Sequence, residues 1–301
     1  MQIFNKNIAL REFLATVTTN KSTIGFVPTM GALHDGHLAL MKQSLQENDF
    51  TVVSIFVNPT QFNNPEDLAK YPRTLEADVE KMRILNDKII VFAPTVDDIY
   101  EGKTTAQSFD YDGLEHQMEG QFRPGHFDGV GTIVKRLFEI VTPTKAYFGE
   151  KDFQQLQIVK KLVAKYEIPV TIVGCPIYRE QSGLAMSSRN ERLTPTERKE
   201  AAIIYAILKE AKSKFQTQEA EIVEDWVKNE FKKHQLFELE YFVIADESTL
   251  LPITFKENSK NYRAFIAVFV NNIRLIDTIT LNNRVIYLVP VLFDFDRLAL
   301  L

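Results

Sequence analysis

The stretch VPTMGALHDGHLALM, residues 27–41, joins an apolar run to a helix-like pattern through a turn that contains glycine. The apolar run, TIGFVP at residues 23–28, is typical of a strand that is buried on both faces. A helix that begins directly after a strand presents unpaired backbone N–H groups and the positive end of its dipole. This stretch therefore predicts an α/β fold with an anion site at the turn.

The same alternation continues along the first half of the chain. Four further strand-like runs lie at residues 51–57, 89–94, 145–149 and 170–176. Helix-period runs lie between them; the clearest is DGVGTIVKRLFEIVTP at residues 128–143, and a second follows Gly149. Strands that alternate with helices predict an α/β fold with a doubly wound, Rossmann-like parallel sheet, whose ligands bind at the carboxyl ends of the strands.

The pattern changes in the second half of the chain. A helix is expected to begin with Thr194 as its N-cap, Pro195 as its first residue and Glu197 as the capping-box partner. Three strand-like runs follow at residues 237–245, 262–270 and 273–281. We therefore expect two domains, the doubly wound one at residues 1–176 and a smaller α+β domain at residues 177–301.

Net charge, cysteine content and the distribution of apolar residues limit the partners and the cellular location that can be expected. A formal net charge of -5 over 301 residues provides no global cationic field, so nucleic acid is not an expected partner. Cys175 is the only cysteine, which excludes an internal disulfide and suits the cytoplasm. The N-terminus has no run long enough to span a membrane. The apolar tail at residues 282–301 is interrupted by Pro290, Asp294 and Asp296, which favours an edge strand or a partner-contact segment over a membrane span.

Two of the five histidines lie at the predicted helix start. His34 and His37 are three residues apart, so both can face the same side of the helix terminus. Gly36 between them lets a ligand approach the backbone. This arrangement suits a clamp for phosphate oxygens. The hydrogen bonds from the imidazole N–H groups would strengthen as negative charge moves onto a departing pyrophosphate. The alternative, histidines that only cap or solvate a helix, is the more common one for an isolated HxGH.

Two further clusters follow predicted strands. In SIFVNPTQF, the amides of Asn58 and Gln61 can bind the hydroxyl and carboxylate groups of a small ligand. In YFGEKDFQQLQIV, Lys151 can neutralise phosphate and Asp152 can accept from a ribose hydroxyl. Taken singly, an Asn-Pro turn and a solvated charged turn remain the alternatives.

Two polar loops complete the candidates for binding. Ser187, Ser188 and Arg189 in LAMSSRNERLT offer two hydroxyls and a guanidinium, a set that suits a triphosphate, or else a polar loop that leads into the next helix. Arg123 and His126 in QFRPGHFDGVG precede the strongest predicted helix. That segment is either a mobile cover over the site or a simple connection.

Two carboxylates are candidates for a metal. Glu76 and Asp78 lie in RTLEADVEKMR and can reach a Mg²⁺ ion. Surface charge on a helix is the alternative, and the charge pattern favours it.

Seven motifs together are more specific than any one of them. In chain order they are PTMGALHDGH, VNPTQF, YPRT, RPGHFDGV, FGEKDFQQL, GLAMSSRN and RLID. Their order and spacing, from about Ile24 to Asp277, resemble the pantothenate synthetase (pantoate:β-alanine ligase) family of HIGH-motif nucleotidyl transferases. The resemblance implies a two-step reaction with ATP as substrate and Mg²⁺. Pantoate attacks the α-phosphorus of ATP to give pantoyl adenylate and pyrophosphate, and the amine of β-alanine then displaces AMP. It also implies a homodimer.

The resemblance assigns roles to residues of both predicted domains. It implies an ATP site at Met30, Gly31, His34, Gly36, His37, Gly149, Glu150, Lys151, Asp152, Tyr178, Met186, Ser187, Ser188 and Arg189. Gln61 and Gln155 would bind pantoate. His37 would be the proton donor, and His34, Lys151 and Arg189 would complete the catalytic set. Met186 to Arg189 would form a mobile loop of the smaller domain that closes on the triphosphate bound to the larger one. No metal ligands are assigned.

Two other functions remain open. A related nucleotidyl transferase would join a nucleotide to a phosphorylated metabolite and give a dinucleotide-type product instead of AMP. A catalytically silent nucleotide-binding module would bind ATP without turnover. The presence of both histidines together with Lys151 and Arg189 argues against the silent module.

Overall fold

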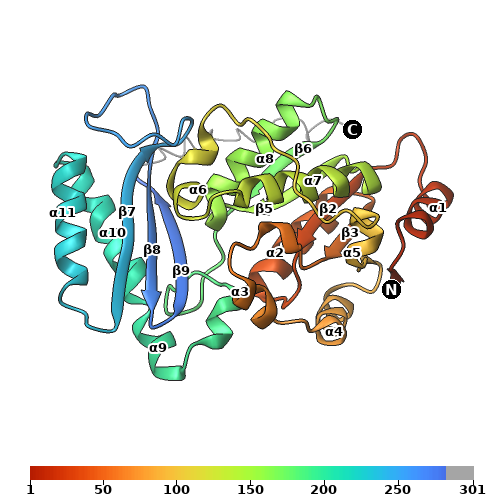
Figure 1. Cartoon of the computed structure of the whole chain (residues 1–301), viewed down its shortest axis with the longest axis horizontal. Helices are drawn as coiled ribbons and strands as arrows, with labels where there is room; N and C mark the ends of the chain where they lie inside the picture. Colours follow the sequence, from red (N-terminus) through yellow and green to blue (C-terminus); the bar gives the residue numbers. More distant parts are fainter. Residues whose placement is uncertain (283–301) are drawn as a thin grey trace, which may run out of the picture.

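Two sheets organise the chain, as a computed structural model that describes residues 1–282 shows (Figure 1). The larger sheet is parallel throughout, in the order β1-β4-β3-β2-β5-β6. Its strands are β1 (Gln2–Phe4), β2 (Ile24–Thr29), β3 (Phe50–Ile55), β4 (Ile90–Phe92), β5 (Lys145–Gly149) and β6 (Thr171–Cys175). The smaller sheet is antiparallel, in the order β7-β8-β9, and consists of β7 (Phe237–Asp246), β8 (Tyr262–Val270) and β9 (Ile273–Thr280). The predicted fold class is confirmed, with β1 as a strand that the sequence did not predict.

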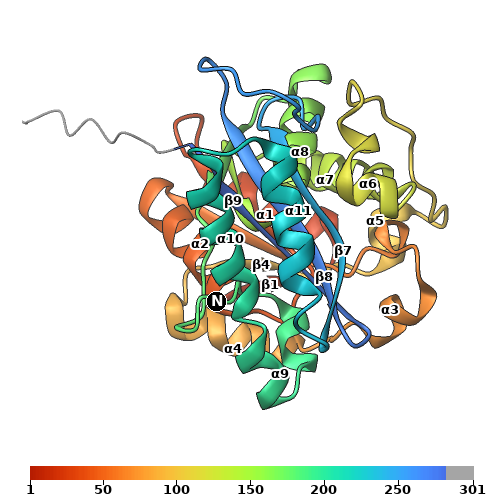
Figure 2. The same ribbon diagram turned by 90° about the vertical axis from the view of Figure 1, so that its left-hand side faces the viewer.

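Helices cover both faces of the parallel sheet and one side of the antiparallel sheet (Figures 1 and 2). The longer helices and short turns that accompany the parallel sheet are α1 (Asn7–Val17), α2 (Asp35–Glu47), η1 (Pro59–Gln61), α3 (Pro65–Lys70), α4 (Leu75–Leu85), α5 (Val96–Tyr100), η2 (Leu114–His116), α6 (Met118–Phe122), α7 (His126–Val141), η3 (Glu150–Asp152) and α8 (Phe153–Lys165). The smaller sheet is accompanied by η4 (Ser188–Arg192), α9 (Pro195–Glu200), α10 (Ile203–Phe215) and α11 (Ala220–Phe231). Helices α10 and α11 and the smaller sheet share a core of their own.

Consecutive side chains of the central strands enter opposite cores. Phe26 and Val52 pack in the core that includes α1, α7 and α8. Val27 and Val53 pack on the other face, in the core that includes α2 and α4. All four are fully buried. This two-sided burial explains why the strands read as continuous apolar runs rather than as alternating ones.

The order of the parallel strands reverses at β2. This strand pairs with β3 on one side, through residues such as Thr29 with Ile55, and with β5 on the other. In open α/β sheets, the crevice at such a reversal lies beyond the carboxyl ends of the two strands. The turn after β2 and the turn after β5 therefore flank the expected ligand site.

The predicted helix start in the smaller part is confirmed. The backbone N–H of Glu197 donates to Thr194 Oγ1 at 3.3 Å, and the N–H of Thr194 donates to the Glu197 carboxylate at 2.7 Å. Pro195 is the first residue of α9. These two bonds satisfy donors that a helix end leaves unpaired.

None of the helices within residues 1–282 combines the length and the apolar character that crossing a membrane requires. The expected edge strand or partner-contact segment in the tail lies, from residue 283 onward, outside the described residues.

Candidate active site

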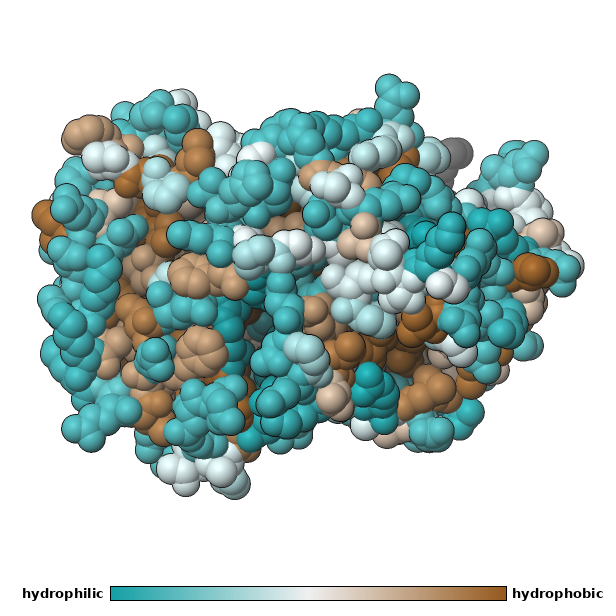
Figure 3. Space-filling view, in the orientation of Figure 1, coloured by the Kyte–Doolittle hydropathy of each residue, from teal (hydrophilic) through white to brown (hydrophobic). Residues whose placement is uncertain are grey.

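A cleft of about 240 Å³ opens at the carboxyl ends of the parallel strands. A hollow between the part that carries the parallel sheet and the part that carries the smaller sheet is visible in Figure 3. The cleft is lined by most of the residues that the sequence assigned to a site: Met30, His34, Gly36, His37, Gln61, Gly149, Lys151, Asp152, Gln155, Tyr178, Met186, Ser187, Ser188 and Arg189. Segments that lie far apart in the sequence thus form one site.

Two of the assigned residues do not line the cleft. Gly31 lies within the turn between β2 and α2, where its backbone has a φ of 81° and a Cβ would lie 3.1 Å from the Asp78 carboxylate. The Glu150 carboxylate instead pairs with the Arg263 guanidinium on β8, at 3.3 Å. Glu150 therefore connects the two sheets.

The rings of His34 and His37 lie against each other, tilted by 34°, at the start of α2. Their ring centroids are 4.0 Å apart, and the backbone N–H of His34 donates to Nδ1 of His37 at 3.4 Å. Because that Nδ1 accepts, neutral His37 carries its proton on Nε2, where it can donate to a ligand. A Cβ on Gly36 would lie 2.9 Å from the His34 ring, so glycine also makes room for this ring.

Burial and neighbouring cations keep both imidazoles neutral. Burial, with a smaller contribution from Lys151, lowers the pKa of His34 to about 4. Burial and the neighbouring His34 hold the pKa of His37 well below its ordinary value. Among the described residues, Nδ1 of His34 is buried without a hydrogen-bond partner. Such an orphaned atom at a cleft is a site that a ligand can satisfy.

The buried carboxylate of Asp78 holds the turn in front of the histidines. It accepts the backbone N–H groups of Ala32 at 2.9 Å and Leu33 at 2.7 Å, and the Thr74 hydroxyl at 3.2 Å. Asp78 is fully buried, so the interpretation as surface helix charge was wrong for this residue, whereas Glu76 is exposed as that interpretation requires. Since backbone donors use its oxygens, Asp78 is a support of the turn that the sequence analysis missed.

Lys151 and Asp152 reach the cleft from η3, directly after β5. The Lys151 ammonium lies 3.7 Å from the Asp152 carboxylate. The Lys151 side chain is mostly buried, whereas the Asp152 side chain is half exposed. A buried cation beside two neutral imidazoles makes this end of the cleft attractive to an anion.

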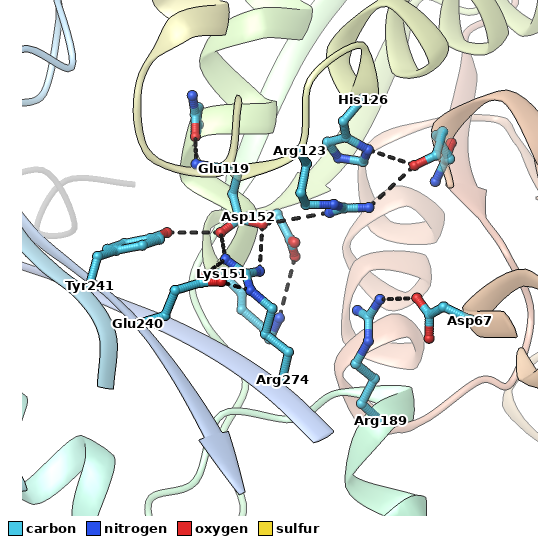
Figure 4. A network of polar contacts seen from close by, with 12 residues as sticks. Asp67, Glu119, Arg123, His126, Lys151, Asp152, Arg189, Glu240, Tyr241 and Arg274 are labelled. Carbon is cyan, nitrogen blue, oxygen red and sulfur yellow. Dashed lines mark hydrogen bonds and ion pairs between the residues drawn. The ribbon is translucent and has the colours of Figure 1, made fainter. Parts of the chain in front are cut away.

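The segment from Met186 to Arg189 lies across the cleft and is tied to the larger part at two points. Ser188 Oγ donates to the carbonyl of Ala32 at 3.0 Å. The Arg189 guanidinium donates to the Asp67 carboxylate on α3 at 3.1 Å, as Figure 4 shows, and Arg192 pairs with the same carboxylate at 3.3 Å. Asp67 is therefore a further residue of the site that sequence reasoning missed.

The RLID motif anchors the base of this segment. Arg179 donates to both oxygens of buried Asp277, at 2.6 and 3.0 Å. The same guanidinium lies over the ring of Tyr205, 3.6 Å from its centroid. A bidentate pair with a stacked aromatic ring fixes the planar guanidinium in one orientation.

The two glutamines approach the cleft from separate elements, Gln61 from η1 and Gln155 from the first turn of α8. The amide oxygen of Gln61 accepts from Asn58 Nδ2 at 3.2 Å. Asn58 is 1% exposed, and its amide also binds the Gly129 carbonyl at 3.0 Å and the Tyr100 hydroxyl at 2.6 Å. Because its polar atoms are engaged within the protein, Asn58 supports Gln61 rather than acting as a free ligand group.

The donor set is not that of a metal held by protein alone. Over residues 1–282, no group of three or more His, Cys, Asp or Glu side chains is placed to hold a metal ion. Asp152 is the carboxylate that lines the cleft. A Mg²⁺ ion that is bound mainly by phosphates, with one carboxylate and waters, fits this arrangement.

Comparisons with known proteins agree with the geometry. Residues 2–280 match the model of the family described as Pantoate-beta-alanine ligase. Pantothenate synthetase of Flavobacterium psychrophilum is 67% identical over 281 residues, which are 93% of this chain and all of the relative. Pantothenate synthetase of Christiangramia forsetii is 56% identical over 94% of this chain and all of the relative.

Solved structures of similar proteins share the fold. The crystal structure of pantothenate synthetase from Thermus thermophilus has a TM-score of 0.86 at 38% identity and covers 94% of this chain and all of that one. Pantoate-beta-alanine ligase from Francisella tularensis, in complex with beta-gamma ATP and beta-alanine, has a TM-score of 0.78 at 36% identity and covers 94% of this chain and 98% of that one.

The role of Asp78 is tested by Asp78→Asn, which keeps the shape but presents only one acceptor to the two N–H groups. We expect the free energy of unfolding, measured by urea denaturation, to fall by about 2 kcal/mol, because charged hydrogen bonds to buried backbone are lost. Glu76→Gln, on the same helix but exposed, is the matched control and should change it little. Equal stability of the two variants would contradict the role of Asp78 in holding the turn.

Proposed function

This chain belongs to the pantoate–beta-alanine ligase family, and from that premise we propose that its cleft holds ATP and pantoate side by side and forms pantoyl adenylate between them. The overall reaction is the ATP-dependent condensation of pantoate with β-alanine to pantothenate, with release of AMP and pyrophosphate. The observation that carries the proposal is one cleft that combines two neutral histidines at a helix N-terminus, Lys151, Arg189 and two glutamines.

ATP lies with its phosphates at the start of α2. The backbone N–H groups and the helix dipole attract the anion, and His34, whose Nδ1 has no partner among the described residues, lines the same cleft. Lys151 supplies a fixed charge. Arg189 exchanges its partner Asp67 for the triphosphate, which brings the segment from Met186 to Arg189 down onto the nucleotide. Asp152 takes the ribose hydroxyls.

Pantoate lies between Gln61 and Gln155. Amides can bind both its hydroxyl and its carboxylate groups without adding a charge that would repel or neutralise the nucleophile. When the carboxylate attacks the α-phosphorus, negative charge moves onto the departing pyrophosphate. The Nε2 proton of His37, together with Lys151 and Arg189, stabilises that charge.

The second step needs no group that becomes covalently attached. The adenylate is already a good leaving group, so the protein has to position the β-alanine amine against the acyl carbon. The one thiol of the chain takes no part, because burial raises the pKa of Cys175 to about 12 and keeps it protonated.

The proposed function also includes Mg²⁺, a role for each of the two domains, a location in the cytoplasm and a homodimer. Mg²⁺ would be held mainly by the phosphates of ATP and would neutralise charge on the triphosphate. The larger domain, residues 1–176, binds ATP and pantoate, and the smaller domain, residues 177–301, carries the Met186–Arg189 loop. The cytoplasm suits a chain with a single buried free thiol. A homodimer without nucleic acid fits the family and the net charge of -5.

Isotope exchange between pyrophosphate and ATP, with Mg²⁺ and pantoate but without β-alanine, tests the adenylate directly. We expect exchange that requires pantoate. If none occurs in folded protein that binds ATP, β-alanine is added and AMP is measured. AMP under those conditions would mean that β-alanine must bind first. A dinucleotide-type product, or no product, would replace the proposal with one of the two other functions.

The role of His37 is tested by His37→Ala. We expect turnover to fall roughly 10²–10³-fold, the scale for loss of one transition-state donor, in a protein that thermal melting shows to be folded. His116→Ala, at an exposed position outside the cleft lining, is the control. Unchanged turnover in a folded His37 variant would remove this residue from the mechanism.

The role of Gln61 is tested by Gln61→Ala. We expect KM for pantoate to rise roughly tenfold or more while KM for ATP stays within about twofold, because pantoate is the one substrate that the proposal places against the Gln61 amide. Steady-state kinetics with each substrate varied in turn measures both constants. An equal loss of affinity for ATP and pantoate would contradict a role confined to pantoate.

A further inference from the structure

A buried ion network lies beside the cleft and joins the two sheets. Glu119 on α6 accepts two hydrogen bonds from the Arg274 guanidinium on β9, both at 2.7 Å, and one from the Tyr241 hydroxyl on β7 at 2.8 Å (Figure 4). The Arg123 guanidinium lies 3.5 Å from the same carboxylate. Burial disfavours the charge on Glu119, but Arg274 and Arg123 outweigh it and lower its pKa to about 2.

Arg123 connects this network to the turn that carries Gln61. Its guanidinium donates to the backbone carbonyl of Gln61 at 3.2 Å, and Nδ1 of His126 lies 2.8 Å from the same oxygen. A carbonyl can only accept, so Nδ1 of His126 carries a proton. Burial, with Arg123 as the next contribution, lowers the pKa of His126 to about 4, so this donor is neutral near pH 7. The two donors occupy both lone pairs of the Gln61 carbonyl.

The η1 turn has weak internal support. The backbone N–H of Gln61 lies 3.5 Å from the Asn58 carbonyl, and that of Phe62 lies 3.2 Å from the Pro59 carbonyl. The first is longer than a normal N–H···O hydrogen bond and the second is at the upper end of the range, and a three-residue 3₁₀ turn has few other backbone hydrogen bonds. The position of the Gln61 backbone therefore depends on donors from outside the turn.

The start of α7 closes on the same turn. A Cβ on Gly129 would lie 2.3 Å from the Thr60 carbonyl oxygen and 2.8 Å from the Cα of Gln61. Only glycine allows this approach, and it leaves no space into which the turn could shift toward α7. The α7 backbone restrains Gln61 from one side while His126 and Arg123 hold its carbonyl.

We propose that His126 and Arg123 are positioning residues for pantoate, which hold the Gln61 carbonyl and thereby direct the Gln61 amide into the cleft. Arg123 also pairs with Glu119, which is bound by Arg274 and Tyr241 of the smaller sheet. The position of the Gln61 amide therefore depends on the smaller sheet as well. The RPGHFDGV segment is then neither a mobile cover nor a simple connection. This inference rests on the proposed binding of pantoate by Gln61.

A matched pair of variants tests the proposal. His126→Asn keeps a donor close to the Nδ1 position, whereas His126→Leu has a similar size and shape without a donor. We expect His126→Leu to raise KM for pantoate roughly tenfold above that of His126→Asn, with kcat and KM for ATP within about threefold, because one hydrogen bond to the turn is lost. Equal KM for pantoate in the two variants, both folded by thermal melting, would overturn the proposal.

A double-mutant cycle separates positioning from a purely structural role. In a Gln61→Ala background no amide remains to be directed, so His126→Leu should raise KM for pantoate no further. Additive effects of the two substitutions would overturn the proposal. If His126→Leu does not fold, Arg123→Met takes its place in the cycle, with Arg123→Lys as the variant that keeps the charge near Glu119.

The pantoate-dependent activity of the wild type and the KM for pantoate of Gln61→Ala are measured in the same experiment. They distinguish failure of the proposed function from failure of the positioning role. A wild type without pantoate-dependent activity, or a Gln61→Ala variant with unchanged KM for pantoate, would overturn the proposed function and this inference with it. An active wild type and a Gln61→Ala variant that is impaired in pantoate binding, combined with identical His126 variants, would overturn the positioning role alone.

Discussion

The site depends first on the buried carboxylate of Asp78, which accepts hydrogen bonds from backbone N–H groups that have no other partner within residues 1–282. After β2 the chain passes through two residues with positive φ, Gly31 and Ala32, before α2 begins. The N–H groups of Ala32 and Leu33 have no strand or helix partner there, and Asp78 accepts both. The Lys81 ammonium binds the Leu33 carbonyl on the other side. With the turn fixed in this way, the helix dipole and both histidines point into the cleft.

The structure uses two kinds of ionic contact for two purposes. The pair between Arg274 and Glu119 is buried and bidentate, and it has further partners, so removing one member would leave an uncompensated charge. The pair between Arg189 and Asp67 is partly exposed and consists of one hydrogen bond. Such a pair contributes little to stability and is easily exchanged. The first kind holds the smaller sheet against α6, and the second is the kind that the proposed function requires of a loop that changes partners.

Much of the fold and the site follows from local sequence patterns. Burial on two faces and helical periodicity both produce patterns that can be recognised in a sequence. They predicted five of the parallel strands and helices α7 and α8, and the capping residues predicted the helix start at Thr194. Strand β1 has only three residues, and Ile3 within it is 44% exposed, so no apolar run marked it. The clustered motifs converge because strands in a parallel sheet end at one edge.

The residues that were missed act through partners distant in the sequence. Asp78 was interpreted by its charge, although it lies on the helical face of Leu75, Val79 and Met82, and that position is the signal that could have identified it. Nothing local links His126 to Gln61, because their contact depends on how α7 packs on η1. Hydrogen bonds between distant segments leave no periodic pattern in a sequence.

The contact between Arg189 and Asp67 also bears on how the protein responds to ionic strength. Mobile ions weaken attraction between partly exposed charges over a distance of about 8 Å at physiological salt. They therefore loosen the hold of Asp67 on Arg189 as well as the attraction of an incoming triphosphate. The two effects oppose each other in the proposed exchange of partners. If the loop exchanges partners as proposed, its closure is thereby buffered against changes in the salt content of its surroundings.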